Sequence, residues 1–187
     1  MIQLPKPAKR PGRSVHVLHF AYGIELHPDE IARMCPGAEL VARASLPGSR
    51  IGFFGHSRVW DGAEEAAVAD PGAALPGVLY RMSPRDADAL EAARGVRLNG
   101  TGIYFHHPAE VLAEDGSRVA AVMLMKTERR APRPPSREYL GRIADGAALR
   151  GLPAVHVAAL RAVASVPASY PVPRLAELPF SLACQDC

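Results

Sequence analysis

The sequence predicts an α+β fold in which a mixed sheet is combined with a few short helices. Segments of alternating apolar and polar residues, such as 38–46 and 118–125, predict strands. Two segments that open with a capping serine, Ser83 and Ser136, predict helices. The strands cluster and the helices are inserted among them irregularly, and this order favours a mixed sheet.

The first half of the chain contains most of the predicted strands, which cover residues 14–20, 38–46, 50–54 and 77–82. Asp70-Pro71-Gly72 is a turn signal, so the chain is expected to reverse there. The polar segment 60–65 is also expected to be a turn. Its Glu64 and Glu65 are interpreted as solvated loop acids, which remain possible ligand contacts if the loop lies near a pocket mouth.

Helices are predicted between these strands. A short helix begins at His27-Pro28, with acidic residues in its first turn. A longer helix has Ser83 as its N-cap and ends near Gly95. Its inward side chains are expected to be Ala87, Leu90 and Ala93.

The second half continues with strands from residue 102 and over 118–125, joined by a hairpin at 113–116. An arginine- and proline-rich loop covers 129–135. The helix that starts at Ser136 is expected to run through residue 147, and a final helix through about residue 164.

Length and composition indicate one domain with a substantial core. The chain has 187 residues, of which 48% are hydrophobic and 22% charged, as in ordinary globular proteins. Residues 1–14 are interpreted as a disordered basic arm, 15–164 as the domain and 165–187 as a proline-rich C-terminal tail. The arm carries Lys6, Lys9, Arg10 and Arg13, so the net charge of +3 leaves the folded body close to neutral.

Several classes of partner are disfavoured. No basic stripe interleaved with aromatic residues indicates nucleic acid, and no apolar run reaches the roughly 18 residues of a membrane span. No signal peptide is recognisable, so a cytoplasmic location is expected. Cys184 and Cys187 form a C-x-x-C pair without a second ligand pair, so neither a metal site nor a cofactor is predicted.

The most informative segment is the strand that runs into Tyr22-Gly23-Ile24-Glu25. Glycine allows backbone amides to approach a ligand closely, and successive amides can form a nest for a carboxylate or an oxyanion. These four residues are therefore predicted to line a ligand site.

The chain also resembles the gamma-glutamylcyclotransferase-like (AIG2-like) family. The resemblance covers about residues 15–163 and rests on an ordered set of motifs: Phe20-Ala21-Tyr22-Gly23, Trp60, Gly77-Val78-Leu79-Tyr80-Arg81-Met82, Gly95-Val96, Gly102-Ile103-Tyr104, Pro135-Ser136-x-x-Tyr139, Gly146-Ala147 and Gly151-Leu152-Pro153. It implies a small mixed β-barrel flanked by helices, with a single cavity. It also implies release of 5-oxoproline from gamma-glutamyl amino acids or amines, without metal or organic cofactor.

Three departures from that family lie at the implied site. The family base is a glutamate immediately before Gly95-Val96, where this chain has Arg94, and arginine cannot act as a base near neutral pH. The opening loop has Ile24-Glu25 where the family has Ser-Asn. After Trp60, where a glycine pair is common, acidic residues appear, with apparently one residue more.

The two charge changes allow two interpretations. Glu25 is a relocated base and Arg94 binds an anionic substrate, or the two residues neutralise each other in a vestigial pocket. An adjacent arginine would lower the pKa of Glu25 and weaken it as a base, which counts against the first interpretation.

Three other residues are candidates for the site. Tyr104 either hydrogen-bonds a substrate carboxyl group or is a core residue of the barrel. His106 either transfers protons or is a rim histidine. Trp60 is expected to anchor the core and also to wall the pocket.

Three functions follow. The first is a diverged enzyme that cyclises or cleaves a small carboxylate-containing amide with a rebuilt acid/base set. The second is a non-catalytic module that binds a small ligand or a partner protein. The third is an amidase or decarboxylase role, as in the small domain of allophanate hydrolases.

Overall fold

The fold is a closed five-stranded barrel in a computed structural model that describes residues 16–97 and 99–174. The strand order is β1-β3-β2-β4-β5, and every neighbouring pair is antiparallel except β5 and β1, which are parallel. The strands are β1 (Val17–Ala21), β2 (Glu39–Ser57), β3 (Gly62–Met82), β4 (Tyr104–Ala113) and β5 (Arg118–Lys126). The predicted mixed α+β barrel is therefore confirmed.

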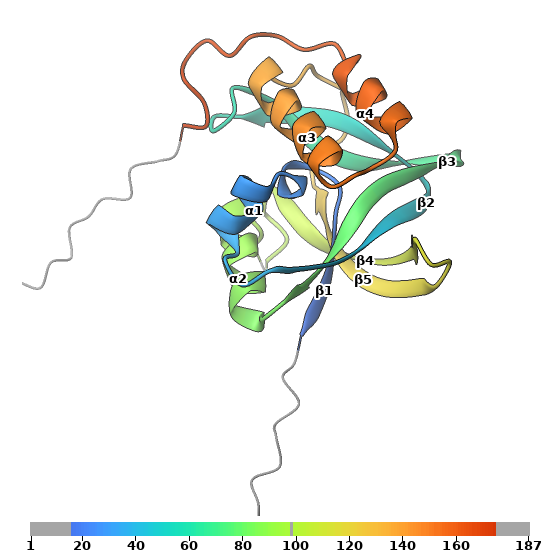
Figure 1. The fold of residues 1–187 in the computed structure, drawn as a ribbon. Helices are drawn as coiled ribbons and strands as arrows, with labels where there is room; N and C mark the ends of the chain where they lie inside the picture. The colour runs from blue at the N-terminus through green and yellow to red at the C-terminus, as the bar shows by residue number, and fades with distance from the viewer. Residues whose placement is uncertain (1–15, 98, 175–187) are drawn as a thin grey trace, which may run out of the picture.

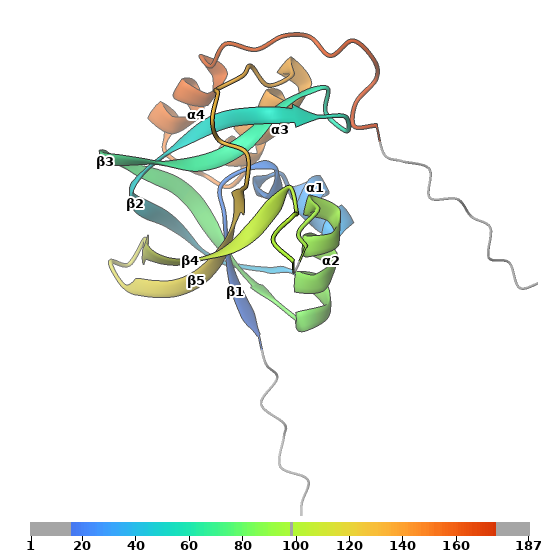
Figure 2. The same ribbon diagram turned by 180° about the vertical axis from the view of Figure 1, so that it is seen from behind.

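Four helices surround the barrel, and a single 3-10 turn over Ile24–Leu26 follows β1. They are α1 (Pro28–Met34), α2 (Pro84–Arg94), α3 (Arg137–Leu149) and α4 (Ala154–Arg161). Helices α3 and α4 lie side by side over one end of the barrel, and α1 and α2 lie at its flank (Figure 1). The view from behind shows α2 beside the start of β4 (Figure 2).

The helix boundaries follow the predicted caps. The Ser83 hydroxyl accepts a hydrogen bond from the Asp86 N–H, and α2 ends at Gly95, whose φ of +67° is the left-handed conformation that glycine favours. The Ser136 hydroxyl accepts from the Tyr139 N–H in the same way. One detail was wrong: Ala93 is exposed, and the inward residue of the last turn is Arg94.

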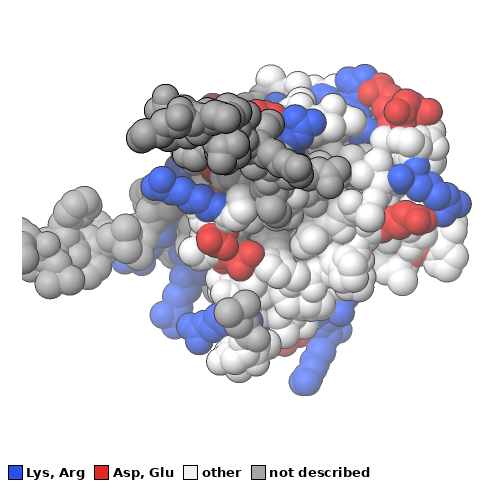
Figure 3. All heavy atoms as spheres, turned by 90° about the horizontal axis from the view of Figure 1, so that it is seen from below, with Lys and Arg blue, Asp and Glu red and all other residues white. Residues whose placement is uncertain are grey.

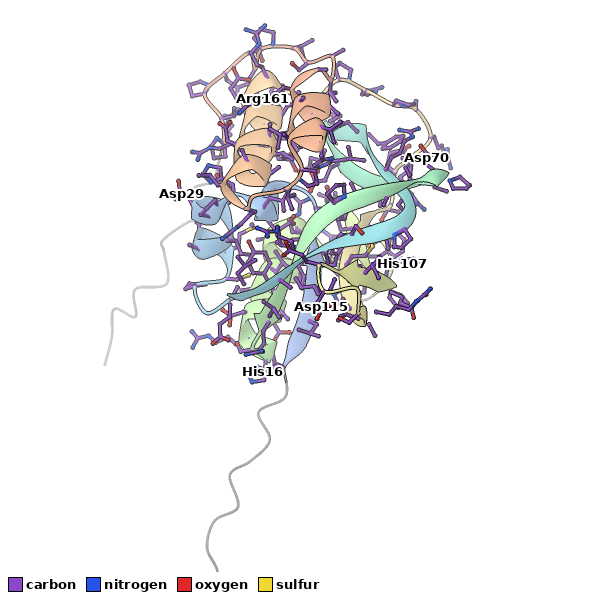
Figure 4. All side chains as sticks on the ribbon, turned by 45° about the vertical axis from the view of Figure 1, so that its right-hand side comes forward. His16, Asp29, Asp70, His107, Asp115 and Arg161 are labelled. Carbon is purple, nitrogen blue, oxygen red and sulfur yellow. The ribbon has the colours of Figure 1, made fainter. Side chains whose placement is uncertain are left out.

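The predicted reversal at Asp70-Pro71-Gly72 is also wrong. Strand β3 continues through these residues, and β2 is likewise one strand where two were expected. Ser49 pairs with Ala69 and Pro47 with Ala74, so the turn-like residues form a bulge in a continuous ladder. A bulge tolerates proline because the extra residues are left out of the ladder. Figure 4 shows Asp70 at the outer end of this ribbon.

Glu64 and Glu65 lie in β3 and are buried, contrary to the expectation of solvated loop acids. The strand begins at Gly62, where a Cβ atom would lie 2.3 Å from the Ser136 nitrogen. Glycine therefore allows the start of α3 to lie directly on the strand. As a result Gly62–Ala67 is buried on both faces, and its two carboxylates are held inside the protein.

Two hydrophobic clusters fill the interior. The larger lies among the barrel wall and all four helices and includes Phe53, Trp60, Leu90, Tyr139, Ile143 and Leu160. The smaller lies within the barrel and includes Phe20, Tyr22, Leu75, Leu79, Val111 and Met123.

The described part of the tail runs back over the loop between β2 and β3. Ser169 donates from both its N–H and its hydroxyl to Asp61, and the Tyr170 hydroxyl donates to the Arg58 carbonyl. The Arg174 N–H donates to the Val59 carbonyl. The predicted arm over 1–14 and the Cys184/Cys187 pair lie outside the described residues.

Candidate functional site

A buried arginine surrounded by carboxylates forms the centre of the candidate site. Arg94, the last residue of α2, is 6% exposed. Its Nη2 lies 2.5 Å from Glu65 Oε1, its Nε lies 2.9 Å from Glu25 Oε1 and its Nη1 lies 3.9 Å from Glu64 Oε1. Sequence elements far apart in the chain therefore converge on one guanidinium group.

The contact between Arg94 and Glu25 differs in kind from the contact with Glu65. The Arg94 Nη2–H donates a hydrogen bond to Glu65, whereas the buried Nε–H is not directed at an acceptor. The attraction to Glu25 is thus a charge–charge contact without a hydrogen bond. The predicted Glu25–Arg94 proximity is present, but the stronger partner of Arg94 is Glu65.

Aromatic residues complete the surroundings of Arg94. Its Cζ lies 4.2 Å from the centroid of the Tyr104 ring, a cation–π distance. Its Nη1 is 3.5 Å from the hydroxyl of Tyr139, which comes from α3. The Tyr139 hydroxyl also donates to Glu65 Oε2, and the Tyr104 hydroxyl donates to the Glu65 backbone carbonyl at 3.2 Å.

Glu65 is the carboxylate with the raised pKa. Burial, with only 2% of the residue exposed, raises the pKa of Glu65 to about 7. Arg94 opposes this shift, while the negative charges of Glu25 and Glu64 add to it. A carboxyl group of this kind changes its protonation state near neutral pH, which is the range that a general base needs.

The Glu65 carboxylate lies directly over the Gly23 backbone. A Cβ atom on Gly23 would be 2.0 Å from Glu65 Oε1, closer than any side chain could tolerate. The φ of Gly23 is −120°, so it is this close approach, and not the backbone conformation, that requires glycine. The ligand cradle at Gly23 stays a prediction, and in this structure a carboxylate of the chain itself lies against that glycine.

A second ion pair lies between this cluster and the surface. Lys126 Nζ is 2.8 Å from Glu64 Oε2 and 4.9 Å from the centroid of the Tyr104 ring. Burial acts to raise the pKa of Glu64, but Arg94 and Lys126 outweigh it and hold that pKa below its usual value. Both residues of the pair line a pocket of about 690 Å³ at the β2–β3 and β4–β5 ends.

The pocket lining carries charged side chains of both signs. Besides Glu64 and Lys126, its charged or titratable lining consists of His56, Arg58, Glu128 and Arg130. Glu64 and Lys126 are thus the residues through which the buried cluster meets the pocket. On the face seen from below, charged side chains lie mainly around the edges (Figure 3).

The remaining ligand-site predictions have structural positions of their own. The Tyr22 hydroxyl donates to the Leu124 carbonyl and accepts from the Ala67 N–H, so its polar atom is used within the barrel. Ile24 is buried in the larger hydrophobic cluster. Trp60 packs against Tyr139 with ring centroids 4.9 Å apart, and so supports the site from behind.

His106 lies in a different pocket, away from the cluster around Arg94. Its Nε2 lies 3.0 Å from Glu91 Oε1 on α2, and both residues line a pocket of about 210 Å³ that also contains His19. Burial lowers the pKa of His19 to about 4, so that imidazole is neutral at pH 7. Within the described residues, no contact joins His106 to Arg94.

Two further features lie away from the cluster. A pocket of about 730 Å³ between the β2–β4 contact and α4 is mainly apolar and contains none of the predicted site residues. Among the described residues no group of histidine, cysteine and carboxylate side chains could hold a metal ion. In the same part of the chain, no helix is long and apolar enough to cross a membrane.

Sequence reasoning kept Glu65 only as a possible ligand contact of a solvated loop, and it did not place Tyr139 or Lys126 at the site. The available signal was Ala63-Glu64-Glu65-Ala66-Ala67, two acids within an otherwise apolar run that continues as a strand. Because Trp60-Asp61-Gly62 precedes this run and is typical of a turn, the whole segment was predicted to be a loop. Lys126 directly follows the predicted strand over 118–125, and no sequence pattern singled it out.

The sequence and the fold are similar to those of known proteins. The AIG2-like family model matches residues 74–160. The human gamma-glutamylcyclotransferase is 27% identical over 150 residues, which cover 78% of each chain. A solved gamma-glutamyl cyclotransferase structure has a TM-score of 0.78 and 25% identity, covering 84% of this chain and 94% of its own.

A more distant solved structure agrees in fold alone. It is a yeast gamma-glutamyl cyclotransferase specific to glutathione, with a TM-score of 0.55 and 13% identity over 79% of this chain. The five-stranded mixed barrel with flanking helices is therefore a gamma-glutamylcyclotransferase-like fold. The chain is thus similar in sequence to AIG2-like proteins and gamma-glutamylcyclotransferases, and it shares the fold of the solved relative.

Proposed function

We propose that the protein is an enzyme of gamma-glutamylcyclotransferase type, acting on a small carboxylate-containing amide with Glu65 as its base. The observation that carries the proposal is the buried Glu65 carboxylate, held by Arg94 and Tyr139 over Gly23, with a pKa raised to about 7. The curated relatives support the reaction class, since they are gamma-glutamylcyclotransferases.

The reaction requires a base, an oxyanion site and a proton for the leaving amine. Glu65 takes a proton from the substrate's own amino group, whose nitrogen then attacks the amide carbonyl carbon. The bond from that carbon to the leaving nitrogen breaks as an acid of the site gives that nitrogen a proton, so the products are a cyclic lactam and a free amine. Arg94, whose Nη2–H donates to Glu65 here, is the donor assigned to the developing oxyanion.

This assignment moves the base from Glu25 to Glu65. In the family resemblance the base stands before Gly95-Val96, the position that Arg94 occupies here. Because arginine cannot be the base, the proposal needs a carboxylate beside it, and Glu65 is the one that Arg94 hydrogen-bonds. Glu25 remains a charge partner on the other side of the guanidinium group. It is thus placed to hold Arg94 in position.

Substrate binding requires the Glu65 side chain to turn away from Gly23. The carboxylate occupies the space over the glycine backbone that a ligand carboxylate would use. Tyr139 and Arg94 bond the two oxygens of Glu65 separately, so one bond can persist while the other breaks. The pocket beside Glu64 and Lys126 is the route by which a ligand would arrive.

The same observation favours a second candidate, a non-catalytic ligand-binding module. Glu65 lying on the cradle and bonded to Arg94 is also what a closed, charge-neutralised pocket would contain. Such a protein would bind a small dicarboxylate in place of Glu65 and would turn nothing over.

The test is turnover of gamma-glutamyl amino acids and gamma-glutamyl amines by the purified full chain, with 5-oxoproline and the free amine measured together. Equal amounts of both products are expected, and Glu65→Gln should lower kcat by about 100-fold or more. Glu110→Gln, at an exposed carboxylate that pairs with Arg118, is the control and should change little. No turnover by the wild type, together with thermal stabilisation by glutamate or glutarate, would favour the binding module.

A further inference from the structure

Lys126 is the one lysine of the described residues, and its position differs from that of an ordinary surface lysine. Its side chain is 4% exposed, and its Nζ is held by Glu64 Oε2 at 2.8 Å. A Cβ atom on Gly55 would lie 3.0 Å from Lys126 Cε, so glycine at 55 leaves room for the lysine stem. The fold thus holds the Lys126 ammonium group at the inner wall of the pocket.

Lys126 is connected to the proposed base Glu65 through Glu64 and Arg94. Glu64 joins the two halves, with Oε1 at 3.9 Å from Arg94 and Oε2 at 2.8 Å from Lys126. Both cations also lie over the Tyr104 ring, at 4.2 and 4.9 Å from its centroid. Glu65 and Lys126 therefore lie on opposite sides of a short polar chain, with Glu65 deep and Lys126 at the pocket.

The direction of the substrate follows from this arrangement. The amino group that attacks must reach Glu65, so the end of the substrate that cyclises is buried. The leaving amine must then point outward, toward the pocket that Glu64 and Lys126 line. An acid placed at that boundary is the group best situated to protonate the leaving nitrogen.

We infer that Lys126 is the general acid for the leaving amine, so that the two proton transfers are divided between Glu65 and Lys126. This inference rests on the proposed function. Glu65 takes the proton from the attacking nitrogen, and Lys126 Nζ gives a proton to the leaving nitrogen as its bond to the carbonyl carbon breaks. Water in the pocket then returns a proton to Lys126, while Glu65 releases its own to solvent, so no other reactant is consumed.

The alternative role for Lys126 is that of a counter-ion that only neutralises buried Glu64. Lys126→Arg separates the two roles, because arginine keeps the charge and the ion pair but cannot give up a proton near pH 7. The leaving group provides the readout. An amine of low basicity, such as p-nitroaniline, departs without help from an acid, whereas an alkylamine requires one.

The experiment measures kcat/KM for gamma-glutamyl derivatives of p-nitroaniline, aniline, benzylamine and butylamine. Lys126→Arg should lose about 100-fold or more on the alkylamines and less than about 10-fold on p-nitroanilide. Glu64→Gln/Lys126→Met, which removes both charges together, should show the same selectivity if Lys126→Arg folds poorly. Arg118→Met, on the same strand and exposed, is the control.

The outcomes are distinct. If Lys126→Arg loses the same factor on every leaving group, or loses nothing, the acid role is wrong while the proposed function stands. If the wild type turns over none of the four substrates, the proposed function fails and the inference fails with it. Selective loss on the alkylamines alone supports the division of proton transfers.

Discussion

The Oε1 atom of Glu65 lies where the Cβ atom of any larger residue at Gly23 would be, with 2.0 Å between the two positions. A loop residue near the start of the chain and a strand residue 42 positions later are therefore fitted to each other. The glycine that the sequence predicts as part of a ligand cradle lies against the chain's own Glu65 carboxylate.

Gly23→Ala should displace Glu65 and disturb the site. The added methyl group cannot coexist with the carboxylate, and β3 holds the Glu65 backbone in place. We expect a loss of about 1–3 kcal/mol in the free energy of unfolding, measured by urea titration, together with a fall in kcat. The control is Gly141→Ala, because Gly141 lies in α3 with open space around its Cβ position. That change should be neutral or stabilising by up to about 1 kcal/mol.

Stability should fall as pH rises toward neutrality because of Glu65. Its pKa is raised from 4.5 to about 7 on folding, so the folded state binds the proton more tightly than the unfolded state does. The resulting stability is fully present below pH 4.5 and is lost as pH rises through about 7. The wild type minus Glu65→Gln difference in unfolding free energy should therefore decline across this window, by on the order of 3 kcal/mol. A flat difference between pH 4 and 8 would show that Glu65 is not perturbed.

The pH dependence of kcat/KM should also report the ionisation of Glu65. If Glu65 must be ionised to accept a proton, kcat/KM rises with pH and levels off above about 7. A rise of kcat/KM centred near pH 4.5 would instead indicate a carboxylate with an unshifted pKa. The measurement is initial rate against pH on a gamma-glutamyl amine, with stability checked at each pH.

Arg94→Met should be severely destabilising, and a second substitution should repair part of the loss. Removing the guanidinium group leaves Glu25 and Glu65 buried beside each other without a cation, at a cost of about 3–5 kcal/mol. Glu65→Gln in the same chain removes one of the unpaired charges. The double variant should therefore be more stable than Arg94→Met alone, as read by thermal unfolding. Equal or lower stability of the double variant would mean that the pair is not coupled.

Several helix ends and one hairpin could be predicted from the sequence because each depends on only a few neighbouring residues. Capping serines at 83 and 136 and the left-handed glycine at 95 fix helix ends through one or two hydrogen bonds. The hairpin at 113–116 is similarly a matter of a few residues. The bulge at Asp70-Pro71-Gly72 could not be predicted, because a turn signal and a bulge differ only in whether the neighbouring strand continues.

The site was predicted in part. Tyr22-Gly23, Glu25 and Arg94 were expected at one place, and Glu25 does lie against Arg94. Glu65 was not expected there because acids beside a Trp-Asp-Gly segment normally stay in water. Their burial depends on Gly62 and on α3 lying over the strand, contacts between positions about 74 apart. Such long-range contacts leave no local pattern in the sequence.

The central claim is that Glu65, and not Glu25, removes the proton from the substrate. The most direct measurement is kcat for Glu65→Gln and Glu25→Gln side by side, on a gamma-glutamyl amine that the wild type turns over. The account predicts a loss of about 100-fold or more for Glu65→Gln and a markedly smaller loss for Glu25→Gln. A larger loss for Glu25→Gln, or full activity in Glu65→Gln, would contradict it.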